Sequence, residues 1–224
     1  LTGTIIHARD ARRIAVFSGA RQAAVDCTAD SHLMDQNYPV GRWNNAYVVV
    51  PFSGQGYDPV RVVASQDGTE LRVNCGDPVV LDAGQMFQVN ASAPMTLVAT
   101  APIGVAQLNT GQDCNPSHIG DPSFQIHPWS GLYRTHARFI SVDHDLFDDQ
   151  TRDFVNVICA DTEDSLLLDG VDVTDQLVPL GFGYSTAQLS VEKGVHELEA
   201  SEGFSGHAYG FSPYDAYTYS LGYD

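Results

Sequence analysis

Short apolar runs separated by turn residues recur along the whole chain. The clearest is residues 47–50, which are aromatic or β-branched for the most part and stop at Pro51, a residue without a backbone N–H to donate. Asp67-Gly68 lies between the strand-like runs at residues 61–65 and 70–74, and Asp-Gly in that position indicates a hairpin. Because no long segment shows helical period, the pattern predicts an all-β chain of many short strands, as in sandwiches and barrels.

The first 36 residues are predicted to hold one hairpin and one loop. Residues 1–19 contain two short apolar runs around a charged turn at residues 8–13 and end at a glycine, which favours a hairpin. Residues 20–36 are mixed and polar, and we expect them to form a loop around Cys27. The chain opens with Leu1 instead of Met, so we expect a piece of a longer protein whose export signal could lie upstream.

The two halves of the chain resemble each other at an offset of roughly 90 to 100 residues, about the size of one small β-sandwich. Residues 60–74 match residues 153–170 in a pattern of strand, acidic turn and strand, and residues 95–111 match residues 196–211. A further match pairs Pro39, Trp43, Tyr47 and Val49 with Pro128, Tyr133, Ala137 and Phe139. The alternative is a chance alignment of two β-rich halves.

Residues 111–128 form the densest cluster of Gly, Pro, Asn and Asp in the chain, which indicates a junction. We therefore predict an all-β fold of two β-sandwich-like modules in tandem. The first is expected at residues 1–111, and the second, a duplicate packed in series with it, at residues 112–224.

The charge of the chain limits its partners. Twenty-eight Asp and Glu against 11 Lys and Arg give a net charge of -17, so there is no basic stripe to bind nucleic acid, and anionic membranes are disfavoured too. Basic partners, cations such as calcium, or solubility in a salty medium all fit this charge. No apolar run approaches the ~20 residues of a transmembrane helix, so no membrane insertion is expected.

Motifs of enzyme chemistry are missing from the sequence. It has no glycine-rich phosphate loop and no GxSxG motif. The eight histidines are scattered without HxH or HExxH spacing, and such spacing would be needed to aim two rings at one metal ion. A pair of glycosidase carboxylates cannot be selected from so many acidic residues. We therefore expect no enzymatic activity.

Two groups of residues are candidates for binding. The acidic stretch at residues 143–153 could wrap a hard cation such as calcium, although a solvated acidic loop is the favoured alternative because the stretch lacks the glycine and the glutamate of an EF-hand; no other cofactor is expected. Its candidate ligands are Asp143, Asp145, Asp148 and Asp149. Aromatic rings suit sugar or protein recognition, because they bury apolar area and keep a polar edge. The candidate contacts are Trp43, Trp129, Tyr209, Tyr214 and Tyr217.

These aromatic residues have an alternative role in packing. Trp43 follows the turn at Pro39 and Gly41 and leads into the strand at residues 47–50. Its ring can pack under that turn while its N–H finds an acceptor. We therefore expect Trp43 to serve packing first and recognition second.

The four cysteines, Cys27, Cys75, Cys114 and Cys159, are widely spaced and form no CxxC pair. A zinc ribbon or a thioredoxin-type site is therefore disfavoured. Two disulfides would allow three pairings, and four buried thiols are the alternative.

Several separated stretches, in order along nearly the whole chain, together resemble the N-terminal domain family of the IgGFc-binding protein. They are SHLMDQNYPVGRWNNAYVVVPF, GQDC with GDPSFQIHP, DFVNVI, GYSTAQLSVEKGVHELEA and YGFSPYDAYTYS. The resemblance implies an extracellular, β-rich binding or adhesion module without catalytic residues, and it implies a disulfide between Cys27 and Cys114. Cys75 and Cys159 stand at less typical positions. Immunoglobulin binding does not follow from resemblance alone.

Two hypotheses of function result. The first is a non-enzymatic adhesion or ligand-recognition module that binds glycans or glycoproteins at a surface. The second is a structural spacer or oligomerisation domain of a large surface protein, stabilised by calcium. In both, the chain is extracellular or on the cell surface as part of a longer exported chain, and a homo-oligomer such as a trimeric fibre tip is compatible with either.

Overall fold

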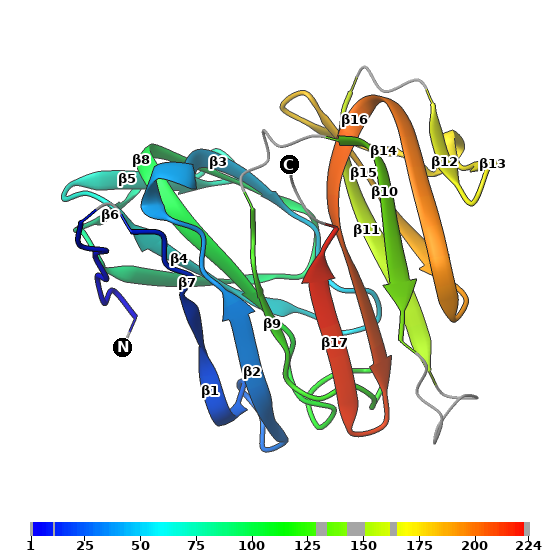
Figure 1. Cartoon of the computed structure of the whole chain (residues 1–224), viewed down its shortest axis with the longest axis horizontal. Helices are drawn as coiled ribbons and strands as arrows, with labels where there is room; N and C mark the ends of the chain where they lie inside the picture. Colours follow the sequence, from blue (N-terminus) through cyan, green and yellow to red (C-terminus); the bar gives the residue numbers. More distant parts are fainter. Residues whose placement is uncertain (1, 11, 129–133, 143–150, 162–164, 222–224) are drawn as a thin grey trace.

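Figure 1 shows a computed structural model of the protein, which consists almost entirely of β-strands. The structure describes residues 2–10, 12–128, 134–142, 151–161 and 165–221. The expected all-β class is confirmed, because two large antiparallel sheets form two β-sandwich-like modules. A third sheet is a two-stranded hairpin near the N-terminus. No helix in the described ranges is long and apolar enough to cross a membrane.

The first module is organised around one long strand. Its first half pairs with β3 and β5, and its second half pairs with β4 and β9, so this strand belongs to both layers. Leu97 and Val105, from the two halves, therefore face one apolar core. The strands are β3 (Asn44–Val49), β4 (Asp58–Ala64), β5 (Thr69–Val73), β6 (Val79–Leu81), β7 (Met86–Ala91), β8 (Met95–Leu108) and β9 (Phe124–Ile126).

The second module repeats this plan around the long strand β16. The first part of β16 pairs with β10 and β12, and its second part pairs with β11 and β17. The strands are β10 (Arg134–Ser141), β11 (Arg152–Ala160), β12 (Leu166–Leu168), β13 (Val171–Asp172), β14 (Val178–Gly181), β15 (Tyr184–Val191), β16 (Gly194–Ser212) and β17 (Asp215–Ser220). Two short 3₁₀ helices complete the described elements, η1 (Val40–Arg42) and η2 (Thr174–Gln176).

The two modules share one order of strands. Tyr47 on β3 lies opposite Leu97 on β8, and Ala137 on β10 lies opposite Leu198 on β16, so the sequence match at these positions is also a match in register. The strand β9, which corresponds to β17, lies beyond the predicted boundary at residues 111 and 112. Because β9 pairs with β8, the pairing of the first sheet continues past that boundary.

The N-terminal segment differs from the expected hairpin and loop. The hairpin consists of β1 (Phe17–Ala24) and β2 (Asp30–Gln36), so the predictions for residues 1–19 and 20–36 are wrong. A turn does occur in the charged segment, where Arg12 N donates to Arg9 O at 3.3 Å. The alternation of apolar and polar residues is weak in these two strands, because most of their side chains are at least partly exposed.

The end of β3 and the residues that follow it join the two modules. Val48 and Val50 pack against Ile158 of β11. Asn156, also on β11, donates through Nδ2 to the carbonyl oxygens of Val50 and Pro51 at 3.2 and 3.1 Å. These contacts bury the end of residues 47–50, the run with the clearest strand pattern in the sequence.

Polar side chains from both modules are buried at this junction. Gln107 of β8 donates to Val50 O at 3.0 Å and to Asp58 Oδ2 at 2.6 Å. Burial raises the pKa of Asp58 to about 8, although hydrogen bonds from Phe52 N and Gln107 oppose this shift. Gln107 Oε1 also lies 2.9 Å from His127 Nε2. Because Asn156 of the second module donates to the same Val50 carbonyl, both modules contribute to one hydrogen-bonded network.

Two buried histidines close the junction. The rings of His127 and His207 lie 5.8 Å apart in an edge-to-face arrangement. Burial lowers the pKa of His127 to about 4, and burial lowers the pKa of His207 well below its usual value, with His127 adding to the effect. The cavity beside them has a volume of about 20 Å³, which is room for a water molecule and little more. The junction is therefore a structural interface.

Candidate functional site

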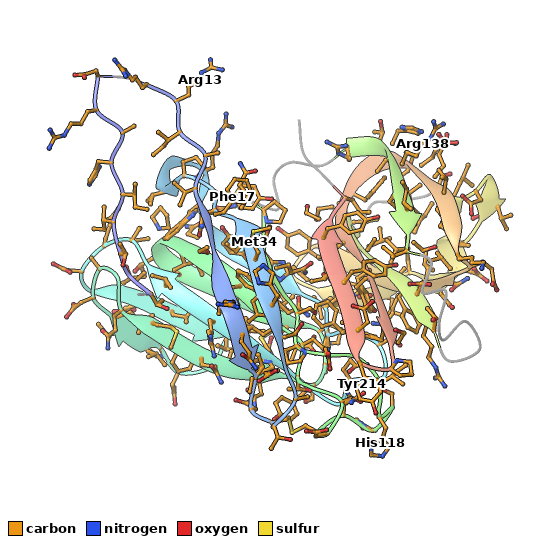
Figure 2. The ribbon with its side chains drawn as sticks, turned by 60° about the horizontal axis from the view of Figure 1, so that its bottom comes forward. Arg13, Phe17, Met34, His118, Arg138 and Tyr214 are labelled. Carbon is orange, nitrogen blue, oxygen red and sulfur yellow. A yellow bond between two sulfur atoms is a disulfide. The ribbon has the colours of Figure 1, made fainter. Side chains whose placement is uncertain are left out.

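Four loop segments from both modules meet at one end of the molecule. They are residues 25–30, 53–57, 111–122 and 212–215, and we call this surface the loop face. Gln55 Nε2 donates to Ser117 Oγ at 3.2 Å, which joins two of them. Gly120 N donates to Ser212 O at 2.9 Å, which joins the two modules. Figure 2 shows His118 and Tyr214 close together at this end.

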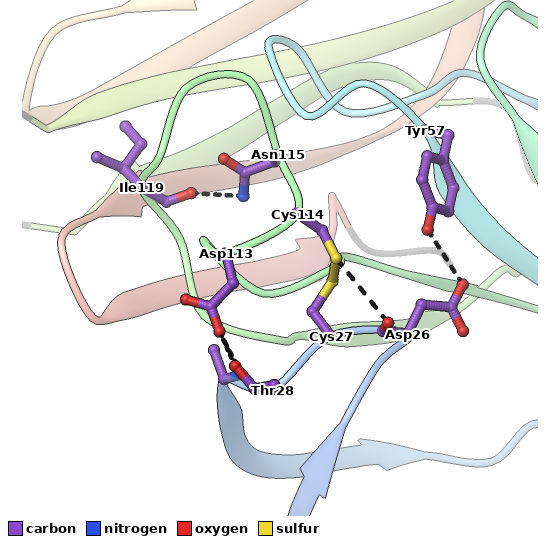
Figure 3. The surroundings of a disulfide bond; sticks show 9 residues. Asp26, Cys27, Thr28, Tyr57, Asp113, Cys114, Asn115 and Ile119 are labelled. Carbon is purple, nitrogen blue, oxygen red and sulfur yellow. Dashed lines mark hydrogen bonds between the residues drawn. A yellow bond between two sulfur atoms is a disulfide. The ribbon is translucent and has the colours of Figure 1, made fainter.

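A disulfide fixes the N-terminal hairpin to the longest of these loops (Figure 3). Cys27 and Cys114 are bonded across 87 residues of sequence, which confirms the pairing that the family resemblance implies. Beside it, the Asp113 carboxylate accepts hydrogen bonds from Thr28 Oγ1 and, at 3.0 Å, from Ala29 N. The turn between β1 and β2 is therefore held on the loop face.

The long loop has a core of its own. The buried Asn115 donates through Nδ2 to Ile119 O at 2.8 Å, and its Oδ1 accepts from Ser117 Oγ at 2.8 Å. Ile119 packs in a cluster with Phe52, Tyr209 and Phe211. Because the loop is bonded internally and anchored on aromatic rings from both modules, it presents a fixed surface.

Three non-glycine residues of the loop face, Asp26, His118 and Tyr214, have a left-handed backbone. The φ angles of His118 and Tyr214 are 56° and 63°. Such conformations are costly for residues other than glycine and are found preferentially at functional sites. Tyr214 is 71% exposed, and its backbone N–H donates to Gln112 Oε1 at 3.3 Å. The exposed ring of Tyr214 thus lies in a strained turn beside the loop of residues 111–122.

The loop face is acidic. Its segments contain five aspartates, Asp26, Asp30, Asp113, Asp121 and Asp215, and no Lys or Arg. Burial raises the pKa of Asp121, and the charges of Asp215, Asp30 and Asp113 raise it further. Tyr57, whose hydroxyl donates to Asp26 Oδ2 at 3.4 Å, also has a raised pKa, from partial desolvation and from the Asp26 charge. The face is thus suited to hydroxyl-rich or cationic ligands.

The aromatic candidates from the sequence lie in different environments. Trp43 donates through Nε1 to Tyr38 O at 3.1 Å, and its ring lies against Gly104, where an added Cβ would be 2.8 Å from Cζ2. These contacts pack the Trp43 ring between the turn and β8.

Tyr209 and Tyr217 are tied into the second module. Tyr209 is completely buried, so the expectation that it is an exposed contact is wrong; its ring packs on Phe52 at the junction. Tyr217 is half-buried and donates its hydroxyl to Asp153 Oδ1 at 2.6 Å. Of the candidate aromatics that the structure describes, Tyr214 is the one that lies on the loop face.

The remaining candidates are placed as follows. Trp129 and the acidic candidates Asp143, Asp145, Asp148 and Asp149 lie outside the described residues. Within the described part of the chain, no group of three His, Cys, Asp or Glu side chains is placed to hold a metal ion. Cys75 is exposed in the first module and Cys159 is buried in the second, and the structure does not join them by a disulfide.

Several loop-face residues were not singled out from the sequence, among them Tyr57, His118 and Asp113. The turn residues clustered at 111–128 indicate a junction and do not by themselves mark a binding surface. A bridge between Cys27 and Cys114 already requires the hairpin turn to meet this segment. No feature of the sequence indicates that Tyr214 of the second module lies beside this loop.

Comparison with known proteins gives one family. A family model described as "IgGFc binding protein" matches residues 1–210. No curated protein matches the chain. Among solved structures, the lectin of Pleurotus ostreatus in complex with GalNAc is 13% identical, with 80% of this chain and 75% of the lectin covered and a TM-score of 0.26.

A second solved structure is similar at a comparable level. An anti-sigma factor domain-containing protein from Clostridium clariflavum is 11% identical, with 79% of this chain and 81% of that chain covered and a TM-score of 0.22. Structural similarity at this level carries no argument about function.

Proposed function

The chain belongs to the IgGFc binding protein family, and we propose that it is a non-enzymatic, extracellular module that recognises glycans or glycoproteins through its loop face. The observation that carries the proposal is the placement of Tyr214. Its exposed ring stands in a strained turn, above a disulfide-anchored loop and among aspartates from both parts of the chain. Rigid loops that carry exposed aromatic and polar groups are typical recognition surfaces.

The chemistry of the loop face suits carbohydrate. A tyrosine ring offers an apolar face to the C–H groups of a sugar and keeps a polar edge in water. Ionised carboxylates only accept hydrogen bonds, and sugar hydroxyls donate them. Asp26 and Asp113 supply such acceptors near Tyr57 and the disulfide. A glycan on the loop face would therefore contact a tyrosine ring and the carboxylates of Asp26 and Asp113 at the same time.

The disulfide between Cys27 and Cys114 supports the extracellular part of the proposal. Disulfides persist in oxidising compartments and are rare in the cytosol. Display on the surface, as part of a longer exported chain, belongs to the same proposal.

A rigid spacer is the second candidate function. The network that includes Gln107, Asn156 and His127 fastens the two modules to each other. A stiff pair of modules of this kind would hold a separate recognition domain at a fixed distance. The two candidates differ in one respect, since a spacer needs no ligand on the loop face.

Replacing Tyr214 by asparagine tests the proposal. Asparagine tolerates the left-handed backbone, so the fold is retained while the ring is lost. We expect binding to the glycans or glycoproteins that the wild type selects on an array to weaken by about tenfold or more, the scale of an aromatic anchor. Titration of the purified variant against those ligands measures the loss.

Phe182 provides a matched control. It is also exposed, at 61%, and has a φ of 60°. It lies in the turn between β14 and β15, near the end of β11 that is remote from the loop face, since Asp161 N donates to Gly183 O there. Phe182→Asn should bind like the wild type. Equal losses in both variants, or an array on which the wild type selects nothing, would refute the proposal.

A further inference from the structure

The N-terminal arm, residues 2–10 and 12–21, differs in charge from the rest of the chain. The first 21 residues contain four arginines and one aspartate, a net charge of +3, whereas the remaining residues carry seven basic and 27 acidic side chains, a net charge of -20. The arginines are Arg9, Arg12, Arg13 and Arg21. A basic segment thus projects from an acidic protein.

The arm also exposes apolar side chains. Ile5, Ile6 and Ile14 are 72%, 59% and 53% exposed, and Phe17 at the start of β1 is 60% exposed. In Figure 2 the arm loops out beyond the sheets, with Arg13 near its far turn and with Phe17 and Met34 on the hairpin below. Its other end returns to the first module, where Gly3 lies against Gly84. Within the described residues, β1 pairs with β2 alone, so its outer edge has unused backbone groups. Apolar groups and an open edge in one segment mark an interaction surface.

In the structure the arm lies at the opposite end of β1 from the loop face of its own molecule. β1 has eight residues and is therefore about 26 Å long. Its Phe17 end carries the arm, whereas its Ala24 end leads into the loop face at Val25. The acidic loop face is thus a whole strand away from the arm, whose Gly3 end lies against Gly84 of the first module. With the arm in this place, contact between the two surfaces needs a second molecule.

The loop face has the complementary charge. It lacks Lys and Arg, and its Asp30, Asp113 and Asp215 lie closely enough for their charges to act on Asp121. Burial is the first cause of the raised pKa of Asp121, and the repulsion among these carboxylates adds to it. A docked guanidinium would relieve that repulsion. The like charges therefore favour a cationic partner.

We propose that the basic arm of one copy docks on the acidic loop face of a second copy, so that copies of this chain associate head to tail. The arginines would pair with the aspartates, and the exposed isoleucines would be covered in the same contact. Because two different surfaces meet, the contact is heterologous and can continue from copy to copy. The inference goes beyond the proposed function and needs no glycan.

Sedimentation of the purified chain at increasing concentration, in low and in moderate salt, tests the inference. We expect a concentration-dependent association that weakens with salt, because surface charge pairs are screened. A wild type that stays monomeric at every concentration in low salt would overturn the inference. The proposed glycan recognition would be untouched by that result, since no glycan is present.

Charge reversal separates the two surfaces. An arm-reversed variant (Arg9→Glu, Arg12→Glu and Arg13→Glu) and a face-reversed variant (Asp121→Lys and Asp215→Lys) should each associate at least about tenfold more weakly than the wild type, the effect of losing close charge pairs. Mixed, they should form complexes again, because the basic arm of the face-reversed copy then meets the intact acidic face of the arm-reversed copy. A mixture that stays monomeric would contradict the inference.

Two further variants serve as controls. A triple variant with the same change of charge outside the arm should associate like the wild type; its substitutions are Arg42→Glu, Arg61→Glu and Arg72→Glu. If this control loses association as the arm-reversed variant does, net charge and not docking is the cause, and the inference is wrong. Should the face-reversed variant melt early, Asp121→Asn with Asp215→Asn removes the charges with little change of shape and must show the same loss.

Discussion

Replacing Cys27 by serine is expected to lower the free energy of unfolding by about 4 kcal/mol. The bond to Cys114 spans 87 residues of sequence, and a cross-link over a loop of that length restricts the unfolded chain strongly in the chain-entropy model. Cys114→Ser should have the same effect, because either substitution removes the same bond. Urea unfolding of the three proteins, followed by circular dichroism, measures the difference.

The exposed thiol of Cys75 offers a control for this experiment. It takes no part in a disulfide, so Cys75→Ser should leave the unfolding midpoint unchanged. Reductant should lower the midpoint of the wild type to that of Cys27→Ser. Equal midpoints for wild type and Cys27→Ser without reductant would show that the bridge does not stabilise the loop face.

Replacing Asn156 by alanine is expected to cost roughly 3 kcal/mol, the scale for leaving two or three buried polar groups without partners. Asn156 Nδ2 donates to the carbonyls of Val50 and Pro51. Its Oδ1 accepts from Tyr209 Oη at 3.0 Å. The bonds to Val50 and Pro51 cross the junction between the modules, so we also expect calorimetry to show one unfolding transition for the wild type and two for the variant.

Arg61 is the matched control, since it stands at the position of β4 that corresponds to Asn156 on β11. It lies opposite Ala106 as Asn156 lies opposite His207. Its side chain bonds Gln88 at the surface, so Arg61→Ala should change stability by less than about 0.5 kcal/mol. If Asn156→Ala unfolds at the wild-type midpoint in one transition, the polar junction does not couple the modules.

The sequence predicted the fold class because short β-branched runs between turns have few other solutions. It did not predict the long strand β8, since Pro102 divides that segment into two apolar runs. In the structure β8 passes through Pro102 at a point where its pairing shifts from Val98 to Ile103. No ladder bond from residue 102 is required at such an irregularity. Pro102 O instead accepts from Ser65 N at 3.1 Å.

The interface between the modules could not be predicted from the sequence, for a different reason. Gln107, Asn156 and His207 are polar, and a pattern of apolar and polar positions assigns such residues to the surface. All three are buried, because each finds a hydrogen-bond partner at the junction, and Asn156 bonds across it to Val50 O. The position of Tyr214 on the loop face depends on this packing and could not be read from local sequence.

The central claim is that the loop face is the recognition surface. Hydrogen exchange of the backbone amides, with and without a glycan or glycoprotein chosen by the wild type on an array, tests it most directly. The account predicts slower exchange at residues 53–57, 111–122 and 212–215, and little change at β12 and β13 on the second module. Protection centred on β12 and β13, with the loop face unchanged, would contradict it.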